Sequence, residues 1–298
     1  MTVRVPAKVN LHLSVGPLRE DGYHELVTVF HAVGLWDEVV AKRTAKRGIS
    51  LKITGEGEDF LPCDESNLAW RAAELLAKDA GFDPDVELRL TKGIPVAGGM
   101  AGGSADAAGA LLACDALWEL NTPRSVLMEL AADLGSDVPF ALHGGTAIGV
   151  GRGEQLTPVL SRGEFHWVFA LADEGLSTPA VYRECDRLRA GRPVREPYVS
   201  DILMQALRAG DAVVLGKALH NDLQEAAISL RPSLRQLLEV GEDYGALGGL
   251  VSGSGPTCAF LVAGEEASLD LAVALTASGA CRTVKRAVGA VPGARIIN

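Results

Sequence analysis

A glycine-rich segment, residues 93–103, runs directly into an alanine- and leucine-rich stretch, 105–120, that predicts a helix. Such a junction points unpaired backbone N–H groups and the positive end of the helix dipole at one spot, which suits a phosphate. Glycine lets a ligand approach the backbone closely because it has no Cβ. Ser104 could cap the helix or offer its hydroxyl to a phosphate or to Mg²⁺. The segment favours a phosphate site, and a structural glycine turn that binds nothing is the alternative.

Two common phosphate-binding loops do not fit this segment. A P-loop requires a lysine directly after its last glycine, and none follows here. A Rossmann turn places its glycines tight against a strand and needs an acidic residue at the end of a second strand. Here the preceding strand is expected to end near Leu90, and the next element is predicted to be a helix over 123–134.

The elements around the loop are expected to be a mixture of helices and short strands. Ser66-Asn67 is an N-cap signal for a helix that ends before Gly81, and Gly135 ends the helix that follows the cap Thr122-Pro123. Strands are predicted at 51–53, 86–90, 165–170 and 258–262. Because these elements do not alternate strictly, we expect an α+β fold rather than a doubly wound parallel sheet. A change of composition near 150–165 predicts two domains, 1–155 and 156–298.

Composition narrows the class of protein. The chain has 298 residues, 48% of them hydrophobic, and a formal net charge of −10, which argues against a nucleic-acid partner. Its five cysteines are scattered without a C-x-x-C pair, so neither a disulfide framework nor a zinc site is expected. No apolar leader and no span of about 18 apolar residues is present. We expect a cytoplasmic protein without membrane partners.

Three segments in order along the chain resemble the motifs of the galactokinase, homoserine kinase, mevalonate kinase and phosphomevalonate kinase (GHMP kinase) superfamily. They are 6–13, 95–108 and 252–257. The resemblance implies a two-domain fold. Its N-terminal nucleotide domain would be of the ribosomal-protein-S5-domain-2-like type, and its C-terminal domain would be ferredoxin-like and contribute to the acceptor site. It also implies ATP and Mg²⁺ as cofactors. The implied ATP-binding residues are Pro95, Val96, Ala97, Gly98, Gly99, Met100, Ala101, Gly102, Gly103, Ser104 and Ala105.

The resemblance also implies catalytic roles for Asp137 and Lys8. Phosphoryl transfer to an alcohol needs a base for the hydroxyl proton and positive charge for the transferring oxygens. Asp137 matches the catalytic aspartate of the superfamily, although it could instead be an N-cap. Lys8 could keep Asp137 ionised and orient the hydroxyl, whereas a solvated strand-edge lysine is the ordinary alternative. Asn10 lies on the same strand face as Lys8 and is expected to bind substrate.

Further strings resemble the superfamily members whose acceptor is a cytidine diphosphate-linked methylerythritol. These are 21–26, 64–68 and 134–139. Tyr23 and Tyr182 are expected to sandwich the pyrimidine and His24 to read its edge. The implied function is ATP-dependent phosphorylation of the 2-hydroxyl of 4-diphosphocytidyl-2-C-methyl-D-erythritol, giving the 2-phosphate and ADP. That reaction belongs to non-mevalonate isoprenoid biosynthesis. We expect a monomer or a weak homodimer.

One departure and two alternatives stand beside this interpretation. The superfamily loop often ends in Gly-Gly-Ser-Ser-Asn-Ala-Ala, whereas this chain has Ser104-Ala105-Asp106. A carboxylate at Asp106 would repel bound phosphates unless it faces away from them or binds the cation. The chain could instead phosphorylate homoserine, mevalonate or a sugar, or bind nucleotide without catalysis.

Overall fold

The computed structural model describes residues 1–96, 98–172 and 175–297. Its strands are β1 (Thr2–Leu18), β2 (His24–Arg43), β3 (Gly48–Gly55), β4 (Asp85–Lys92), β5 (Thr146–Gly151), β6 (Gln155–Pro158), β7 (Phe165–Leu171), β8 (His220–Asn221), β9 (Gly248–Val251), β10 (Cys258–Val262), β11 (Thr283–Gly289) and β12 (Arg295–Ile297). Its helices are α1 (Leu68–Asp79), α2 (Gly102–Trp118), α3 (Arg124–Leu134), α4 (Val138–His143), α5 (Thr178–Arg189), α6 (Asp201–Ala209), α7 (Ala212–Ala218), α8 (Gln224–Leu230), α9 (Ser233–Asp243) and α10 (Glu265–Ser278).

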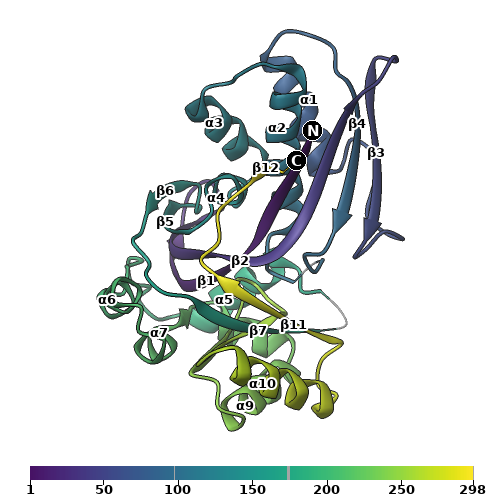
Figure 1. Cartoon of the computed structure of the whole chain (residues 1–298). Helices are drawn as coiled ribbons and strands as arrows, with labels where there is room; N and C mark the ends of the chain where they lie inside the picture. The colour runs from purple at the N-terminus through teal and green to yellow at the C-terminus, as the bar shows by residue number, and fades with distance from the viewer. Residues whose placement is uncertain (97, 173–174, 298) are drawn as a thin grey trace.

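The described strands form one mixed sheet built around the long antiparallel pair β1 and β2. The central order is β12-β1-β2-β11-β7-β10-β9, and β2 also pairs with β5 through its first half and with β4 through its second half. Figure 1 shows α1, α2 and α3 grouped beside one end of this sheet, and α9 and α10 beside β7 and β11 at the other end. Helices and strands do not alternate strictly, which confirms the expected α+β class.

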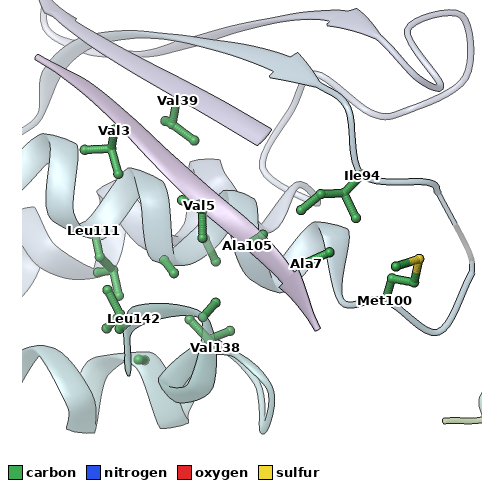
Figure 2. Close-up of a cluster of buried hydrophobic side chains, with 14 of the residues drawn as sticks. Val3, Val5, Ala7, Val39, Ile94, Met100, Ala105, Leu111, Val138 and Leu142 are labelled. Carbon is green, nitrogen blue, oxygen red and sulfur yellow. The ribbon is translucent and has the colours of Figure 1, made fainter. Parts of the chain in front are cut away.

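Strand β1 is buried on both faces, and this positions the site. Its alternating residues Val3, Val5 and Ala7 are at most 1% exposed and point toward α2 and α4, as Figure 2 shows. Side chains on a strand alternate between its two faces, so Lys8 and Asn10 must point the other way. The apolar face is held in the core, and the polar face is thereby fixed as the wall of a cleft.

The predicted helices and strands are present, but some of them begin or end at other residues than expected. Strand β10 matches its expected range, while β4 runs on to Lys92, past Leu90. Helix α3 begins at Arg124 with Pro123 in the N-cap position. Helix α2 begins at Gly102, inside the glycine loop, so Ser104 lies in the first helical turn and is not the N-cap. The N-cap residue of α2 is Ala101 in the left-handed conformation, without a side-chain cap.

The second half of the chain folds back onto the glycine loop. Strands β9 and β10 form an antiparallel hairpin over a buried cluster that includes Val251, Cys258 and Phe260. The hairpin connection, 252–257, contacts the loop through Ser252, whose hydroxyl donates to the carbonyl oxygen of Gly99 at 3.3 Å. This segment is therefore both a hairpin turn and a support for the glycine loop. Within the described ranges, no helix has the length and apolar character required to cross a membrane.

Candidate active site

Lys8 and Asn10 enter the cleft side by side from β1. Lys8 is 7% exposed, and its Nζ donates to the side-chain oxygen of Asn10 at 2.7 Å. The amide nitrogen of Asn10 donates in turn to the Thr28 hydroxyl on β2 at 2.8 Å. The Lys8 ammonium also lies 5.6 Å from the centroid of the Phe30 ring, a cation–π distance. Lys8 is therefore a buried, oriented cation and not a solvated edge residue.

Asp137 meets Lys8 from the opposite side of the cleft. Its Oδ2 lies 3.6 Å from Lys8 Nζ, and its side chain is 30% exposed. The residue occupies the N-cap position of α4, but its side chain makes no capping hydrogen bond. The capping alternative therefore fails at the level of the side chain, because the carboxylate is directed at Lys8. Residues 129 positions apart in the sequence form this pair, as expected.

The glycine loop borders the Lys8–Asp137 pair. The backbone N–H of Lys8 donates to the carbonyl oxygen of Met100 at 3.3 Å. Gly99 has a φ of +71°, and a Cβ there would collide with the carbonyl oxygen of Ser252, so only glycine fits. Met100 and Ala105 have their side chains in the core, which leaves them only backbone atoms to offer a ligand. Ala97, also expected to bind ATP, lies outside the described residues.

A buried group of three charged side chains beneath the loop was not anticipated. Lys92 donates both to Asp37 and to Asp106, the latter at 2.6 Å, and also to the carbonyl oxygen of Gly102 at 3.2 Å. Asp37 accepts from the backbone N–H groups of Gly93 and Ile94 at 2.7 and 2.9 Å. This triad, Asp37–Lys92–Asp106, thus holds both ends of the glycine loop. The signal in the sequence is the lysine immediately before Gly93.

Asp106 pairs with the Lys92 ammonium although it also lines the loop cavity, and this pairing offsets the repulsion of phosphates that a free carboxylate would cause. It is 4% exposed, and its Oδ1 has no hydrogen-bond partner among the described residues. Burial raises the pKa of Asp106 to about 8, against the lowering effect of Lys92, and the nearby Asp37 carboxylate raises it further. Burial lowers the pKa of Lys92, but the carboxylates of Asp106 and Asp37 outweigh burial and raise that pKa above its ordinary value. Lys92 therefore stays a cation, and Asp106 is the member that takes up a proton.

We expect the protonation of Asp106 to make stability depend on pH. Its pKa is higher in the folded protein than its ordinary value of 3.8, so the folded state holds a proton that the unfolded chain has released. The unfolding free energy should therefore fall as pH rises from about 4 to about 8, by roughly 1 kcal/mol per pH unit at most. Asp106→Asn should abolish this component. Urea unfolding of both proteins across that range measures it, and parallel pH profiles would contradict it.

Three cavities adjoin one another along the cleft. The loop cavity, about 330 Å³, is lined by the glycine loop together with Asn67 and Lys92. The central cavity, about 280 Å³, contains Lys8, Asn10 and Asp137, and it shares Gly99 and Ala101 with the loop cavity. The outer cavity, about 910 Å³, shares one wall with the central cavity. That shared wall consists of Leu26, Ser136, Arg152, Thr178 and Tyr182. A ligand on the loop and one in the outer cavity can therefore meet at Lys8 and Asp137.

The residues expected at the pyrimidine lie together in the outer cavity. Tyr23, His24 and Tyr182 all line it. His24 is 7% exposed, its ring lies 5.2 Å from that of Tyr182, and its Nε2 pairs with Asp186 Oδ1 at 2.9 Å. Burial, and secondarily Asp137, raise the pKa of Tyr182, so its phenol stays neutral. Tyr23 is 54% exposed at the rim. Asp186 was not anticipated, because only the fold brings this residue of α5 next to His24 at the start of β2.

Comparison with known proteins first defines the class. The family model of the GHMP kinases N-terminal domain matches residues 67–145, and that of the GHMP kinases C-terminal domain matches residues 203–281. A homoserine kinase from Cytophaga hutchinsonii shares the fold, with a TM-score of 0.75 at 19% identity over 100% of this chain and 97% of that one. The chain is a member of the GHMP kinases, and the expected two-domain GHMP-type fold is confirmed.

Its full-length relatives define the family more narrowly. The chain is 58% identical over its whole length to the 4-diphosphocytidyl-2-C-methyl-D-erythritol kinases of Mycolicibacterium smegmatis and Mycobacterium tuberculosis, covering 92% and 93% of them. A crystal structure of 4-(cytidine 5'-diphospho)-2C-methyl-D-erythritol kinase matches with a TM-score of 0.79 at 34% identity, over 97% of this chain and 98% of that one. Within the GHMP kinases, this chain belongs to the 4-diphosphocytidyl-2-C-methyl-D-erythritol kinase family.

Proposed function

We propose that this protein transfers the γ-phosphoryl group of ATP to the 2-hydroxyl of 4-diphosphocytidyl-2-C-methyl-D-erythritol in the cleft formed by the three cavities. The products are the 2-phosphate and ADP, and the reaction serves non-mevalonate isoprenoid biosynthesis. The observation that carries the proposal is the 3.6 Å contact between Lys8 and Asp137 in the central cavity, between the glycine loop and the outer cavity.

The chemistry at this pair follows from charge and position. Asp137 accepts the proton of the attacking hydroxyl, since its carboxylate lies in the central cavity beside the Lys8 ammonium, where the hydroxyl would be held. Lys8 orients the hydroxyl and offsets charge on the transferring phosphoryl oxygens. Asn10 fixes the Lys8 ammonium through the 2.7 Å hydrogen bond and can bind the acceptor. Backbone N–H groups between Val96 and Ala105 would hold the ATP phosphates.

The donor set fits a magnesium ion that arrives with ATP. Among the described residues there is no cluster of three or more His, Cys, Asp or Glu side chains that could hold a metal. Mg²⁺ commonly keeps several waters and binds substrate phosphates with only one or two protein ligands. Ser104, at the start of α2, would supply such a ligand, whereas Asp106 is turned toward Lys92. Bound Mg²⁺ would neutralise phosphate charge during transfer.

The acceptor's cytidine would lie in the outer cavity between Tyr23 and Tyr182, with His24 at its edge. His24 Nε2 faces the Asp186 carboxylate, which can only accept, so that nitrogen carries the proton. Nδ1 of a neutral His24 is then an acceptor suited to the amino group of cytosine. We also propose that residues 1–155 form the ATP-binding and catalytic domain and that 156–298 contribute to the acceptor site.

Replacing the half-buried Tyr182 should selectively weaken binding of the acceptor. Base stacking on an aromatic side chain is worth about 1–3 kcal/mol, so Tyr182→Leu should raise KM for the acceptor roughly fivefold to a hundredfold. KM for ATP should stay within about twofold, because the loop cavity does not include Tyr182. Tyr244→Leu, at an exposed position after α9, is the matched control. Equal increases in both KM values would argue against the assignment.

A panel of acceptors tests the proposed function itself. ADP formation would be followed with 4-diphosphocytidyl-2-C-methyl-D-erythritol, homoserine, mevalonate and galactose in turn, at saturating ATP and Mg²⁺. We expect turnover with the cytidine diphosphate-linked acceptor and at most traces with the others. Faster turnover with another acceptor would assign the outer cavity to a different substrate. No turnover with any of them would favour a nucleotide-binding protein without catalysis.

A further inference from the structure

Arg152 lies where the central and outer cavities join. It stands at the tip of the β5–β6 hairpin, between Gly151 and Gly153. Among the described residues that line the two cavities, Arg152 is the one lysine or arginine that belongs to both. Lys8 lines only the central cavity, and Arg183 lines only the outer one. A cation therefore occupies the passage between the two cavities.

The hairpin turn holds the Arg152 backbone in place without neutralising its side chain. The backbone N–H of Arg152 donates to Glu154 Oε2 at 2.8 Å, and the N–H of Gly153 donates to the carbonyl oxygen of Val150 at 3.0 Å. The guanidinium carbon of Arg152 lies 5.2 Å from the centroid of the Tyr23 ring. In the described part of the chain, no carboxylate forms an ion pair with this guanidinium.

Three of the acids that line the two cavities are engaged with other partners. Asp137 faces Lys8, Asp186 pairs with His24, and Asp21 pairs with Arg19 at 2.9 Å. A partly buried guanidinium that stacks on a ring but lacks an anion has unused donors. Its planar fork matches phosphate oxygens, to which it can donate two parallel hydrogen bonds.

The geometry points to Arg152 as the residue that binds the diphosphate of the acceptor, an inference that rests on the proposed function. An acceptor with its base in the outer cavity and its hydroxyl at Asp137 must lay its diphosphate across the shared wall. That wall offers the Arg152 cation together with the hydroxyls of Ser136 and Thr178. By stacking on Tyr23 the same side chain would couple recognition of the diphosphate to the position of one aromatic face. Arg152 is thus a specificity-determining residue for nucleotide-linked acceptors.

The test compares ligands that differ only in the diphosphate. Inhibition constants of CDP and of cytidine, each competing with the acceptor, would be measured for the wild type, Arg152→Met and Arg152→Lys. Loss of a charged hydrogen-bonding partner should raise the constant for CDP roughly tenfold to a hundredfold in Arg152→Met, and less in Arg152→Lys. The constant for cytidine should stay within about twofold. Arg4→Met is the matched control, because Arg4 stacks 5.9 Å from Trp36 and lines none of the three cavities.

The outcomes separate this inference from the proposed function. An unchanged constant for CDP in Arg152→Met, in an enzyme that still phosphorylates the acceptor, would overturn the inference alone. Equal losses for CDP and cytidine would also overturn it, since they would assign Arg152 to support of the Tyr23 ring. A wild-type protein that neither phosphorylates the acceptor nor is inhibited by CDP would overturn both.

Discussion

Asp137→Asn should lower kcat by a factor on the order of 10² or more while leaving the affinity for ATP within about twofold. The amide keeps the shape of the side chain but cannot accept the proton of the attacking hydroxyl, and general base catalysis contributes about 10²–10⁴ to rate. The loss should fall on kcat because Asp137 lines the central cavity, not the loop cavity. Steady-state ADP formation together with calorimetric titration of ATP measures both quantities.

The control for this variant is a carboxylate outside the cleft. Asp243→Asn, at the exposed end of α9, removes the same charge and should leave kcat within about twofold. An Asp137→Asn enzyme with the turnover of the wild type would show that another group takes the proton. In that case the contact with Lys8 would be an ordinary ion pair.

Lys92→Met should destabilise the protein by about 3–5 kcal/mol, the usual cost of leaving a buried charge without its partner. Lys92 has 2% of its side chain exposed and Asp37 none, so water cannot replace the lost contact. Because the triad also holds both ends of the glycine loop, the affinity for ATP should fall as well. Urea unfolding measures the first effect and titration with ATP the second.

A double substitution and a surface pair serve as controls for Lys92. Asp37→Asn removes the charge that Lys92→Met would strand, so the double variant should lose at least about 2 kcal/mol less than the two single losses added together. The exposed pair Lys52–Glu87 offers the comparison at the surface, where Lys52→Met should cost under about 1 kcal/mol. Additive losses in the double variant would mean that the triad is not an energetic unit.

Local patterns predicted the elements that carry the site but not all of their limits. The placement of Lys8 and Asn10 on one face of the first strand and the capping signal at Ser66-Asn67 are properties of neighbouring residues. Both are present, and Asn67 accepts from the N–H of Ala69. Helix α2 begins three residues before the predicted start, although glycine disfavours helices. The contact of Lys92 with the carbonyl of Gly102 and the packing of α2 on β1 outweigh that propensity, and neither is visible in a local window.

The site residues also divide into those that local motifs predict and those that only the fold places. Lys8, Asn10 and Asp137 could be predicted because they stand in motifs with a recognisable order. Asp37 and Lys92 could not, because what places them together is the register of two strands, in which Glu38 lies opposite Thr91. The sequence identifies Asp106 as a departure from the superfamily loop. The side chain of Asp106 pairs with Lys92, 14 positions earlier in the chain, which only the fold brings within reach. Arg152 does not belong to any of the motifs identified in the sequence. Its importance follows only from its position in the lining of both the central and the outer cavity.

The most direct test is the crystal structure of the protein with the cytidine diphosphate-linked acceptor and a non-hydrolysable ATP analogue. We expect the acceptor's 2-hydroxyl within hydrogen-bonding distance, about 2.6–3.2 Å, of the Asp137 carboxylate, with the γ-phosphate in line on the side of the glycine loop. The pyrimidine should lie between Tyr23 and Tyr182. An acceptor bound with its hydroxyl away from both Lys8 and Asp137, or a triphosphate bound outside the glycine loop, would contradict the proposed function.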